Sequence, residues 1–196
     1  MIFTATRLQD AVIIDVERRG DERGHLARTY CEQEFADHGL VTRFVQASTI
    51  FSPERDTLRG LHFQTPPHGE VKLVRCTRGA AQVTIVDLRP DSPTYLKWLA
   101  VELTPENGRL IYVPVGFAQG YQTLVEDTEV AYRMSHEYVP QAASGVRWND
   151  AVFGIEWPAA ERRIISERDQ AWPDYQPCRP RPSQAPPALT AAPHVG

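Results

Sequence analysis

The stretch WLAVELTPENGRLIYV, residues 98–113, has the pattern of two β-strands joined by a tight turn. Apolar side chains occupy every second position from Leu99 to Leu103, a period typical of a strand with one buried face. Asn107-Gly108 follows, and both residue types tolerate the positive φ of a two-residue hairpin loop. The sequence therefore predicts strands at 98–103 and 110–113, joined as a hairpin.

Outward from this stretch, other short runs rich in Val, Ile, Tyr and Phe are separated by turn sequences such as Arg78-Gly79. Many short strands, spaced roughly ten residues apart, are typical of a sandwich or barrel and favour a jelly-roll topology. The clearest helix is short, at 32–38, and Gly39 is placed to end it. We therefore expect a mainly β fold with short helices. The other clear strands are predicted at 44–51, 71–76, 82–88 and 129–134.

The composition changes after Trp172. Residues 173–196 contain 7 of the 16 prolines, with many alanines and few large apolar side chains. Such a segment cannot bury enough surface to offset the entropy lost on ordering. We therefore expect one domain over residues 1–172 and a flexible, disordered Pro/Ala-rich C-terminal tail over residues 173–196.

Composition and charge exclude several classes of function. Hydrophobic residues make up 42% and charged residues 23%, as in an ordinary globular protein. The formal net charge is −4 and the 21 basic residues are scattered, so no nucleic-acid partner is expected. No apolar run approaches the roughly 18 residues of a membrane span, and no secretory signal opens the sequence. Three separated cysteines do not make a disulfide framework, so we expect a cytoplasmic protein with no membrane contact.

The stretch LRGLHFQ, residues 58–64, places charged residues in an apolar strand, which is unusual because buried charges need partners. In a regular strand Arg59 and His62 point to opposite faces. They share a face only if the strand bulges, and Gly60 is where such a bulge fits. On composition alone, His62 is either a hydrogen-bonded core histidine or a functional residue.

A metal site is not expected at this stretch. Metalloenzymes with a barrel of the cupin class use a His-x-His pair, a Glu and a later His. Here the pair is broken as His62-Phe63-Gln64, and Gln119 stands where the last His would fall. His62 and Glu70, even with His68 from a turn, do not supply the three rigid ligands typical of a catalytic metal.

The remaining residues are suited to proton transfer. His62 would act as a general base, and Tyr132 would act as an acid unless it is an interior tyrosine bonded to backbone. Lys72 would stabilise a developing oxyanion. Arg23 and Arg59 carry the forked guanidinium that suits phosphate.

Eight segments along the chain form an ordered set: DERG (21–24), LRGLHFQ (58–64), KLVRC (72–76), DLRPDSPT (87–94), PVGFAQGY (114–121), GVRWND (145–150), GIEWP (154–158) and SERD (166–169). They occur in the order found in the dTDP-4-dehydrorhamnose 3,5-epimerase family, which the chain resembles from about residue 11 to residue 172. The resemblance implies a cupin-type double-stranded β-helix (jelly roll). It also implies an isomerase that epimerises a nucleotide-diphosphate-linked 4-keto-6-deoxysugar at C3 and C5, with no cofactor and no metal. The product would serve deoxysugar and polysaccharide biosynthesis.

The resemblance also implies a role for each site residue. A dyad of His62 and Asp169 would take the proton from the carbon next to the ketone. Lys72 would stabilise the enolate, and Tyr132 would return a proton from the opposite face of the sugar. Asp169 has a second interpretation, because Ser166-x-x-Asp169 resembles a helix capping box, although no apolar helix follows.

The resemblance implies substrate contacts as well. Arg59 would bind the diphosphate together with Arg23, supplied by the partner subunit of a homodimer that exchanges strands near the N-terminus. Tyr138 would stack on the nucleobase. The other expected substrate contacts are Gln46, Ser48 and Gln119.

Three positions depart from the family pattern. Gln119 replaces a His on the sugar side, Ser48 replaces an Asn, and Arg28 lies where aromatics followed by Glu are expected. The departures fall on residues that shape the ligand site, while the catalytic candidates are kept. Three alternatives therefore stay open: an epimerase of one centre (C3 or C5), a 3,4-ketoisomerase on a CDP-, GDP- or dTDP-sugar, and a non-catalytic sugar-nucleotide binding module.

Overall fold

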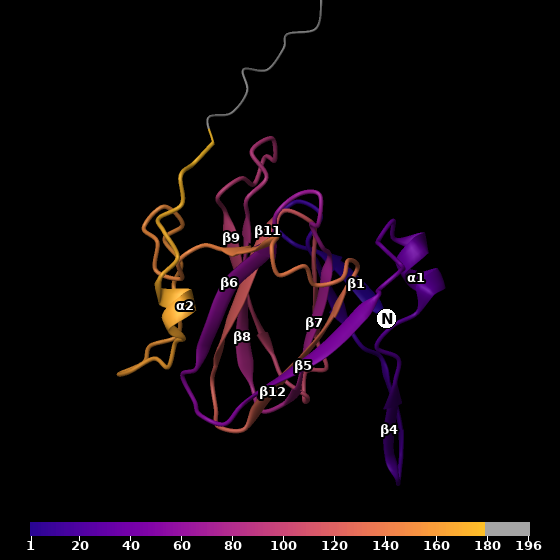
Figure 1. The fold of residues 1–196 in the computed structure, drawn as a ribbon. Coiled ribbons are helices and arrows are strands. Elements are labelled where there is room, and N and C mark those ends of the chain that lie inside the picture. The colour runs from indigo at the N-terminus through magenta and orange to yellow at the C-terminus, as the bar shows by residue number, and fades with distance from the viewer. Residues whose placement is uncertain (179–196) are drawn as a thin grey trace, which may run out of the picture.

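Two antiparallel sheets face each other in the computed structural model, which describes residues 1–178 (Figure 1). One sheet has six strands in the order β1-β2-β10-β7-β12-β5, and the other has five in the order β13-β6-β11-β8-β9. Apart from the pairs β1–β2 and β8–β9, neighbouring strands in these two sheets are not consecutive in the sequence, as in a jelly roll. The mainly β fold predicted from the strand spacing is confirmed.

The strand bounds are β1 (Ile2–Ala5), β2 (Val12–Asp15), β3 (Arg18–Asp21), β4 (Gly24–Ala27), β5 (Gln46–Ser52), β6 (Leu58–Gln64), β7 (Lys72–Arg78), β8 (Ala81–Asp87), β9 (Trp98–Leu103), β10 (Leu110–Val113), β11 (Phe117–Thr123), β12 (Thr128–Met134) and β13 (Ala143–Gly145). The part of the chain that the structure describes has two short helices, α1 (Glu32–Asp37) and α2 (Glu167–Gln170).

The predicted hairpin between β9 and β10 is wrong, although both strands have the predicted bounds. β9 pairs with β8 at the edge of the five-stranded sheet, whereas β10 pairs with β2 and β7 in the six-stranded sheet. The turn itself forms: Asn107 Oδ1 accepts the N–H groups of Thr104 and Arg109, and Gly108 has φ 62°. Local sequence set the reversal of the chain, and packing between the sheets set the partners of each strand.

Apolar side chains fill the space between the two sheets. Val74 and Ile111 from the six-stranded sheet meet Val83, Ile85 and Leu103 from the five-stranded sheet in one buried cluster. Each such burial is worth roughly 1.5–3 kcal/mol relative to exposure. The core therefore holds the two sheets together. It does not fill all the space between them, because a cavity lined partly by polar residues remains there.

Helix α1 covers the outer face of the six-stranded sheet. Its Phe35 is fully buried in a second cluster with Ile14, Leu73 and Leu110. The helix lies where the sequence predicts it, and Gly39 follows with φ 68°, a conformation that favours glycine.

The bulge expected at Gly60 is confirmed. His62 pairs with Gln119 and Arg59 pairs with Tyr121, so three steps along β6 match two steps along β11. Since Gln119 and Tyr121 lie on one face of β11, Arg59 and His62 also share a face. The bulge therefore turns both residues toward the space between the sheets.

We predict that Gly60→Ala destabilises the protein by more than its backbone angle alone explains. Gly60 has φ 127°, and an added Cβ would lie 2.5 Å from the Cα of Gly120. A strained φ costs about 1–3 kcal/mol, to which this clash adds. Gly154→Ala is the matched control, because Gly154 has φ 59° and nothing within 4 Å of its Cβ position. Urea unfolding measures both variants, and equal losses of stability would contradict the tight fit of β6 on β11.

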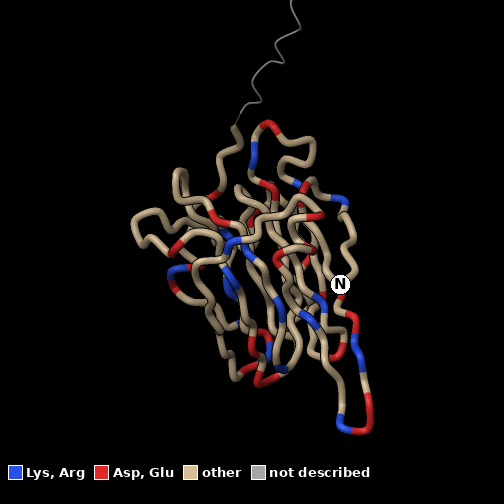
Figure 2. The backbone as a smooth tube through the Cα atoms, turned by 90° about the vertical axis from the view of Figure 1, so that its right-hand side faces the viewer, with Lys and Arg blue, Asp and Glu red and all other residues tan. Residues whose placement is uncertain are grey.

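The β3–β4 hairpin projects from the body of the molecule (Figures 1 and 2). Seven of its eight strand residues are exposed, and the Leu26 side chain is 71% exposed. Over the rest of the described chain, basic and acidic residues are interspersed along the backbone (Figure 2). No helix in residues 1–178 is long and apolar enough to cross a membrane.

The start of the predicted tail contacts the body. Tyr175 packs beside Phe153 and donates its backbone N–H to Asp150, and Asp174 forms an ion pair with Arg147. Residues 174 and 175, which follow the predicted boundary at Trp172, thus contact the apolar cluster and polar groups on the outer face of the five-stranded sheet. The rest of the predicted tail, residues 179–196, lies outside the described residues.

Candidate active site

A cavity of about 330 Å³ lies between the two sheets. Its walls come from β6 and β11 on one side, from β5, β7 and β12 on the other, and from helix α2. All four residues predicted to be catalytic line it, together with three of the predicted substrate contacts. These residues are His62, Lys72, Tyr132, Asp169, Arg59, Gln119 and Tyr138.

His62 and Asp169 form a close pair at this cavity. His62 Nε2 lies 2.6 Å from Asp169 Oδ1, and Asp169 Oδ2 accepts the backbone N–H of Gly60 at 3.1 Å. The Asp169 side chain is 6% exposed, whereas that of His62 is 43% exposed. A carboxylate that accepts from Nε2 fixes the tautomer and leaves Nδ1 as the nitrogen free to take a proton.

Asp169 makes both contacts that its sequence position suggests, one to the helix cap and one to the histidine. Ser166 is the N-cap of helix α2, and its Oγ accepts the backbone N–H of Asp169 at 3.1 Å. A short helix that the sequence did not predict does form here, over four residues. Capping uses the backbone of Asp169, so its carboxylate remains free to reach His62 on β6.

The environment of Asp169 favours its ionised form. Burial by itself would raise the pKa of this carboxyl. The hydrogen bond and charge of His62, with the Gly60 N–H, outweigh burial and hold the pKa below its usual value. Asp169 is therefore a carboxylate at neutral pH, as an orienting partner for a histidine must be.

Lys72 is almost completely buried beside this pair. Its side chain is 9% exposed, and Nζ donates to the backbone carbonyl of His62 at 3.1 Å. Nζ also lies 3.0 Å from Glu70 Oε1. The lysine thus presents a desolvated positive charge to the cavity, next to the strand that carries the histidine.

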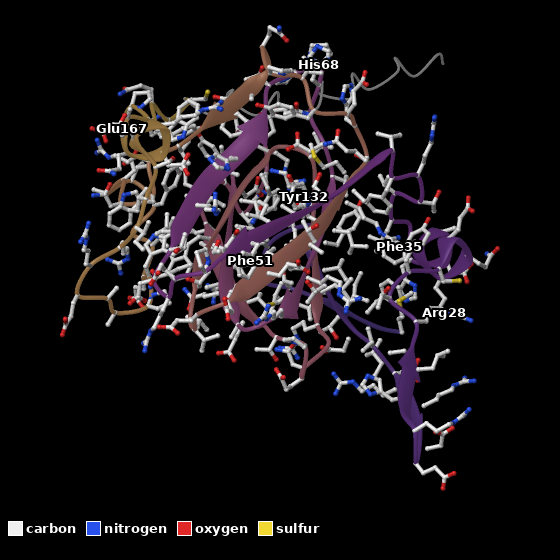
Figure 3. The ribbon with its side chains drawn as sticks, turned by 60° about the horizontal axis from the view of Figure 1, so that its bottom comes forward. Arg28, Phe35, Phe51, His68, Tyr132 and Glu167 are labelled. Atoms are coloured by element: carbon white, nitrogen blue, oxygen red, sulfur yellow. The ribbon has the colours of Figure 1, made fainter. Side chains whose placement is uncertain are left out.

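Tyr132 lies on the sheet opposite His62. It occupies the middle of β12, pairs with Val74 of β7 and Ser48 of β5, and points into the barrel (Figure 3). No hydrogen bond forms to its hydroxyl within residues 1–178, so the backbone-bonded alternative is not what the structure has. A ligand between the sheets would have His62 on one side and Tyr132 on the other.

Two further predicted contacts lie beside His62. Gln119 lies on β11 directly opposite His62 in the strand register. Arg59 reaches the cavity because of the bulge, and its Nε donates to Ser52 Oγ at 3.3 Å. Arg59 thus brings a second cation to the cavity wall, in addition to Lys72.

Tyr138 lines the cavity from the segment after β12, and two glutamines hold that segment. Gln46 Oε1 accepts the backbone N–H of Tyr138 at 2.9 Å. Gln64 donates to the carbonyls of His68 and Glu137 and accepts the N–H of Val139. Gln46 therefore contacts the predicted nucleobase residue, whereas it does not line this cavity as a sugar contact would.

Besides Gln46, two more predicted contacts do not line the cavity. Ser48 is opposite Tyr132 in register but is absent from the cavity wall. Arg23 is at the tip of the β3–β4 hairpin, 84% exposed and paired with Asp21. Arg28 is also remote from the cavity, at the base of this hairpin, where it pairs with Glu34 (Figure 3).

Three residues that line the cavity have no catalytic or substrate role predicted from the sequence. Arg168 lines the wall from helix α2, one residue before Asp169, and its guanidinium lies over the ring of Trp172. Gln64 and Glu70 are buried polar residues that a sequence signal could have indicated, since each stands two residues from a catalytic candidate. Within residues 1–178, no three His, Cys, Asp or Glu side chains come together as a metal-binding group.

Fold and cavity together define a jelly-roll enzyme of the cupin class with acid–base residues in its interior. Comparison with known proteins makes this specific. The family model described as dTDP-4-dehydrorhamnose 3,5-epimerase matches residues 5–176, and the chain belongs to this family of isomerases.

Individual relatives agree with the family match. The dTDP-4-dehydrorhamnose 3,5-epimerase of Methanothermobacter thermautotrophicus is 42% identical over 183 residues, which cover 92% of this chain and 96% of that protein. The crystal structure of the Bacillus anthracis enzyme, with TDP and PPi bound, has a TM-score of 0.85 and 38% identity, covering 88% and 98% of the two chains. A 3'-monoepimerase from Streptomyces bikiniensis, in complex with dTDP-quinovose, has a TM-score of 0.80 and 28% identity, covering 86% and 85%.

Proposed function

We propose that this protein epimerises a dTDP-linked 4-keto-6-deoxysugar at C3 and C5. Family membership and relatives crystallised with TDP or a dTDP-sugar support the substrate class. The single observation that carries the proposal is the placement of His62 and Tyr132 on facing sheets of one cavity. The Lys72 ammonium lines the same cavity and is hydrogen-bonded to the His62 carbonyl. A base and an acid on opposite sides of a sugar are what inversion of a carbon centre requires.

The proposed steps balance without a cofactor. His62 Nδ1 takes the proton from the carbon next to the C4 ketone, and the C–H electron pair becomes the enolate, with its charge on the C4 oxygen. Asp169 stabilises the imidazolium, and Lys72 stabilises the enolate oxygen. Tyr132 then gives its proton to the other face of the same carbon, and the ketone reforms. His62 releases its proton to solvent, and the Tyr132 oxygen takes one from solvent, which restores the enzyme. The C3 and C5 centres both flank C4, so the same oxyanion group serves either.

Solvent exchange tests this function directly. The protein is incubated with dTDP-4-keto-6-deoxyglucose in D₂O, and the C3 and C5 proton signals are followed by NMR. Loss of both signals supports the double epimerase. Binding of the nucleotide sugar with no exchange at either carbon would instead identify a binding module. Movement of the carbonyl from C4 to C3 in the ¹³C spectrum would identify a ketoisomerase.

A single-centre epimerase is the second candidate, supported by the likeness to a 3'-monoepimerase and by Gln119 as the neighbour of His62. Gln119 is a neutral amide where the family pattern has a His, so it would hold a different hydroxyl of the sugar. That change would alter which carbon of the sugar lies next to His62 Nδ1. In the same NMR experiment this candidate predicts loss of one signal only. The position of that signal names the carbon.

We further propose a homodimer in which the β3–β4 hairpin of one subunit reaches the cavity of the other. The hairpin stands away from its own body, and Arg23 at its tip does not line its own cavity. A projecting, exposed hairpin with an arginine at the tip suits a diphosphate held between subunits.

Mixing two inactive variants tests this arrangement. Arg23→Ala and His62→Ala should each be impaired alone. After the subunits are mixed and allowed to exchange, one site in each mixed dimer has both an intact His62 and an intact Arg23. We expect mixing to restore up to about a quarter of the wild-type rate, since mixed dimers form half of the population and carry one good site of two. An Arg23 that serves its own subunit would give no restoration.

We propose one catalytic domain followed by a separate C-terminal tail, in a protein of the cytoplasm. Cys31, Cys76 and Cys178 are all free, as is typical of a reducing compartment. An epimerase of this type supplies a deoxysugar for a surface polysaccharide or a glycosylated metabolite.

A further inference from the structure

One buried charge in the cavity has no part in the proton-transfer steps. Glu70 lies just before β7, and its side chain is 3% exposed. Its Oε1 is 3.0 Å from Lys72 Nζ, and its Oε2 accepts the backbone N–H of Gln64 at 3.2 Å. Both carboxylate oxygens therefore have a partner, one in the Lys72 side chain of β7 and the other in the Gln64 backbone of β6.

Fold stability does not account for this pair. Removing two opposite charges from water costs about as much as their attraction returns, so apolar residues of similar size hold a core as well. Both residues instead line the cavity: Lys72 opens β7, the strand beside the β12 of Tyr132, and Glu70 lies just before it. Their position points to the reaction.

We propose that Glu70 is a positioning residue that aims Lys72 at the C4 oxygen of the substrate; this rests on the proposed function. An ammonium has three N–H groups. Glu70 Oε1 and the His62 carbonyl hold two sides of the Lys72 ammonium at 3.0 and 3.1 Å. The remaining N–H is then directed to an oxygen in the cavity, at a fixed place relative to His62, whose own carbonyl on β6 holds the ammonium.

The benefit is preorganisation. A donor already in place when charge develops on the enolate costs no reorganisation during the reaction. A flexible lysine without Glu70 would occupy several rotamers, and a misplacement of about 1 Å can cost about a hundredfold in rate. The carboxylate also weakens the positive field of Lys72, so if only net charge mattered, removing it would accelerate the reaction. The two possibilities predict opposite signs.

Glu70→Gln is the first test, because Gln keeps the size and one acceptor but loses the charge and cannot serve both Lys72 and the Gln64 N–H. We expect kcat on dTDP-4-keto-6-deoxyglucose to fall about ten- to a hundredfold, with KM and the affinity for dTDP changed by less than about twofold. Glu102→Gln, on an exposed position of β9, is the matched control and should leave kcat unchanged. An unchanged or increased kcat in Glu70→Gln overturns the proposal.

A double variant separates positioning from general damage. If Glu70 acts through Lys72, then Glu70→Gln combined with Lys72→Met has the same kcat as Lys72→Met alone. Thermal unfolding should rank the double variant above Lys72→Met, because the single change leaves a buried carboxylate without its partner. A further loss of kcat in the double variant contradicts action through Lys72.

Failure of the underlying function gives a different result. A wild-type protein that binds dTDP but exchanges no sugar proton refutes the proposed epimerase, and with it the positioning role. A wild-type protein that exchanges both protons, with Glu70→Gln equally fast, refutes the role of Glu70 alone.

Discussion

His62→Ala should lower the rate of C3 and C5 proton exchange by about 10²- to 10⁴-fold, the usual contribution of a general base. His62 presents its free ring nitrogen to the cavity only because Asp169, at 2.6 Å from Nε2, orients the ring. Among the described residues on this wall of the cavity, no other side chain has a carboxylate that orients it as a base. NMR exchange in D₂O and product analysis measure the effect.

Asp169→Asn should reduce exchange as well, by a smaller factor than His62→Ala. The amide can donate a proton toward Nε2, which favours the tautomer with its proton on Nδ1, the wrong nitrogen for a base. Gln170→Ala, on the exposed side of the same helix, is the control for helix α2. If His62→Ala and Asp169→Asn both exchange at the wild-type rate while binding dTDP, the base assignment is wrong.

Tyr132→Phe should separate exchange from inversion. The base and the enolate-stabilising lysine are untouched, so deuterium should still enter at carbon next to the ketone, returned from the His62 side. Inversion at one or both centres should fall by about 10²- to 10⁴-fold, because the opposite sheet no longer supplies a proton. Deuterium content is read by NMR, and configuration by the coupling constants of the product.

Tyr112→Phe is a suitable control for this variant, because Tyr112 is a strand tyrosine outside the cavity whose hydroxyl accepts the Val41 N–H. Its exchange and inversion rates should match those of the wild type. Equal losses of exchange and inversion in Tyr132→Phe would show that the tyrosine acts at the deprotonation step, and would contradict its assignment as the acid for the second face.

The sequence predicted well those features that depend on neighbours along the chain. The alternation of Leu99 to Leu103 defined β9, Gly39 marked the end of α1, and Gly60 marked the bulge in β6. The same local view failed for the Asn107-Gly108 turn, because a turn sequence fixes a reversal of direction and not the sheet that receives the next strand.

The ordered motifs determined the family and the types of residue at the site, because residue identity and order can be read directly from a single sequence. Only the tertiary structure decided how these residues meet. His62 and Asp169 are 107 positions apart, and a bulge in one strand and a four-residue helix bring them within 2.6 Å. It also placed Tyr132 opposite His62, bound Glu70 to Lys72, and left Arg23 on a projecting hairpin. The physical reason is that these contacts depend on strand register and sheet packing, which arise from the whole core and not from any one segment.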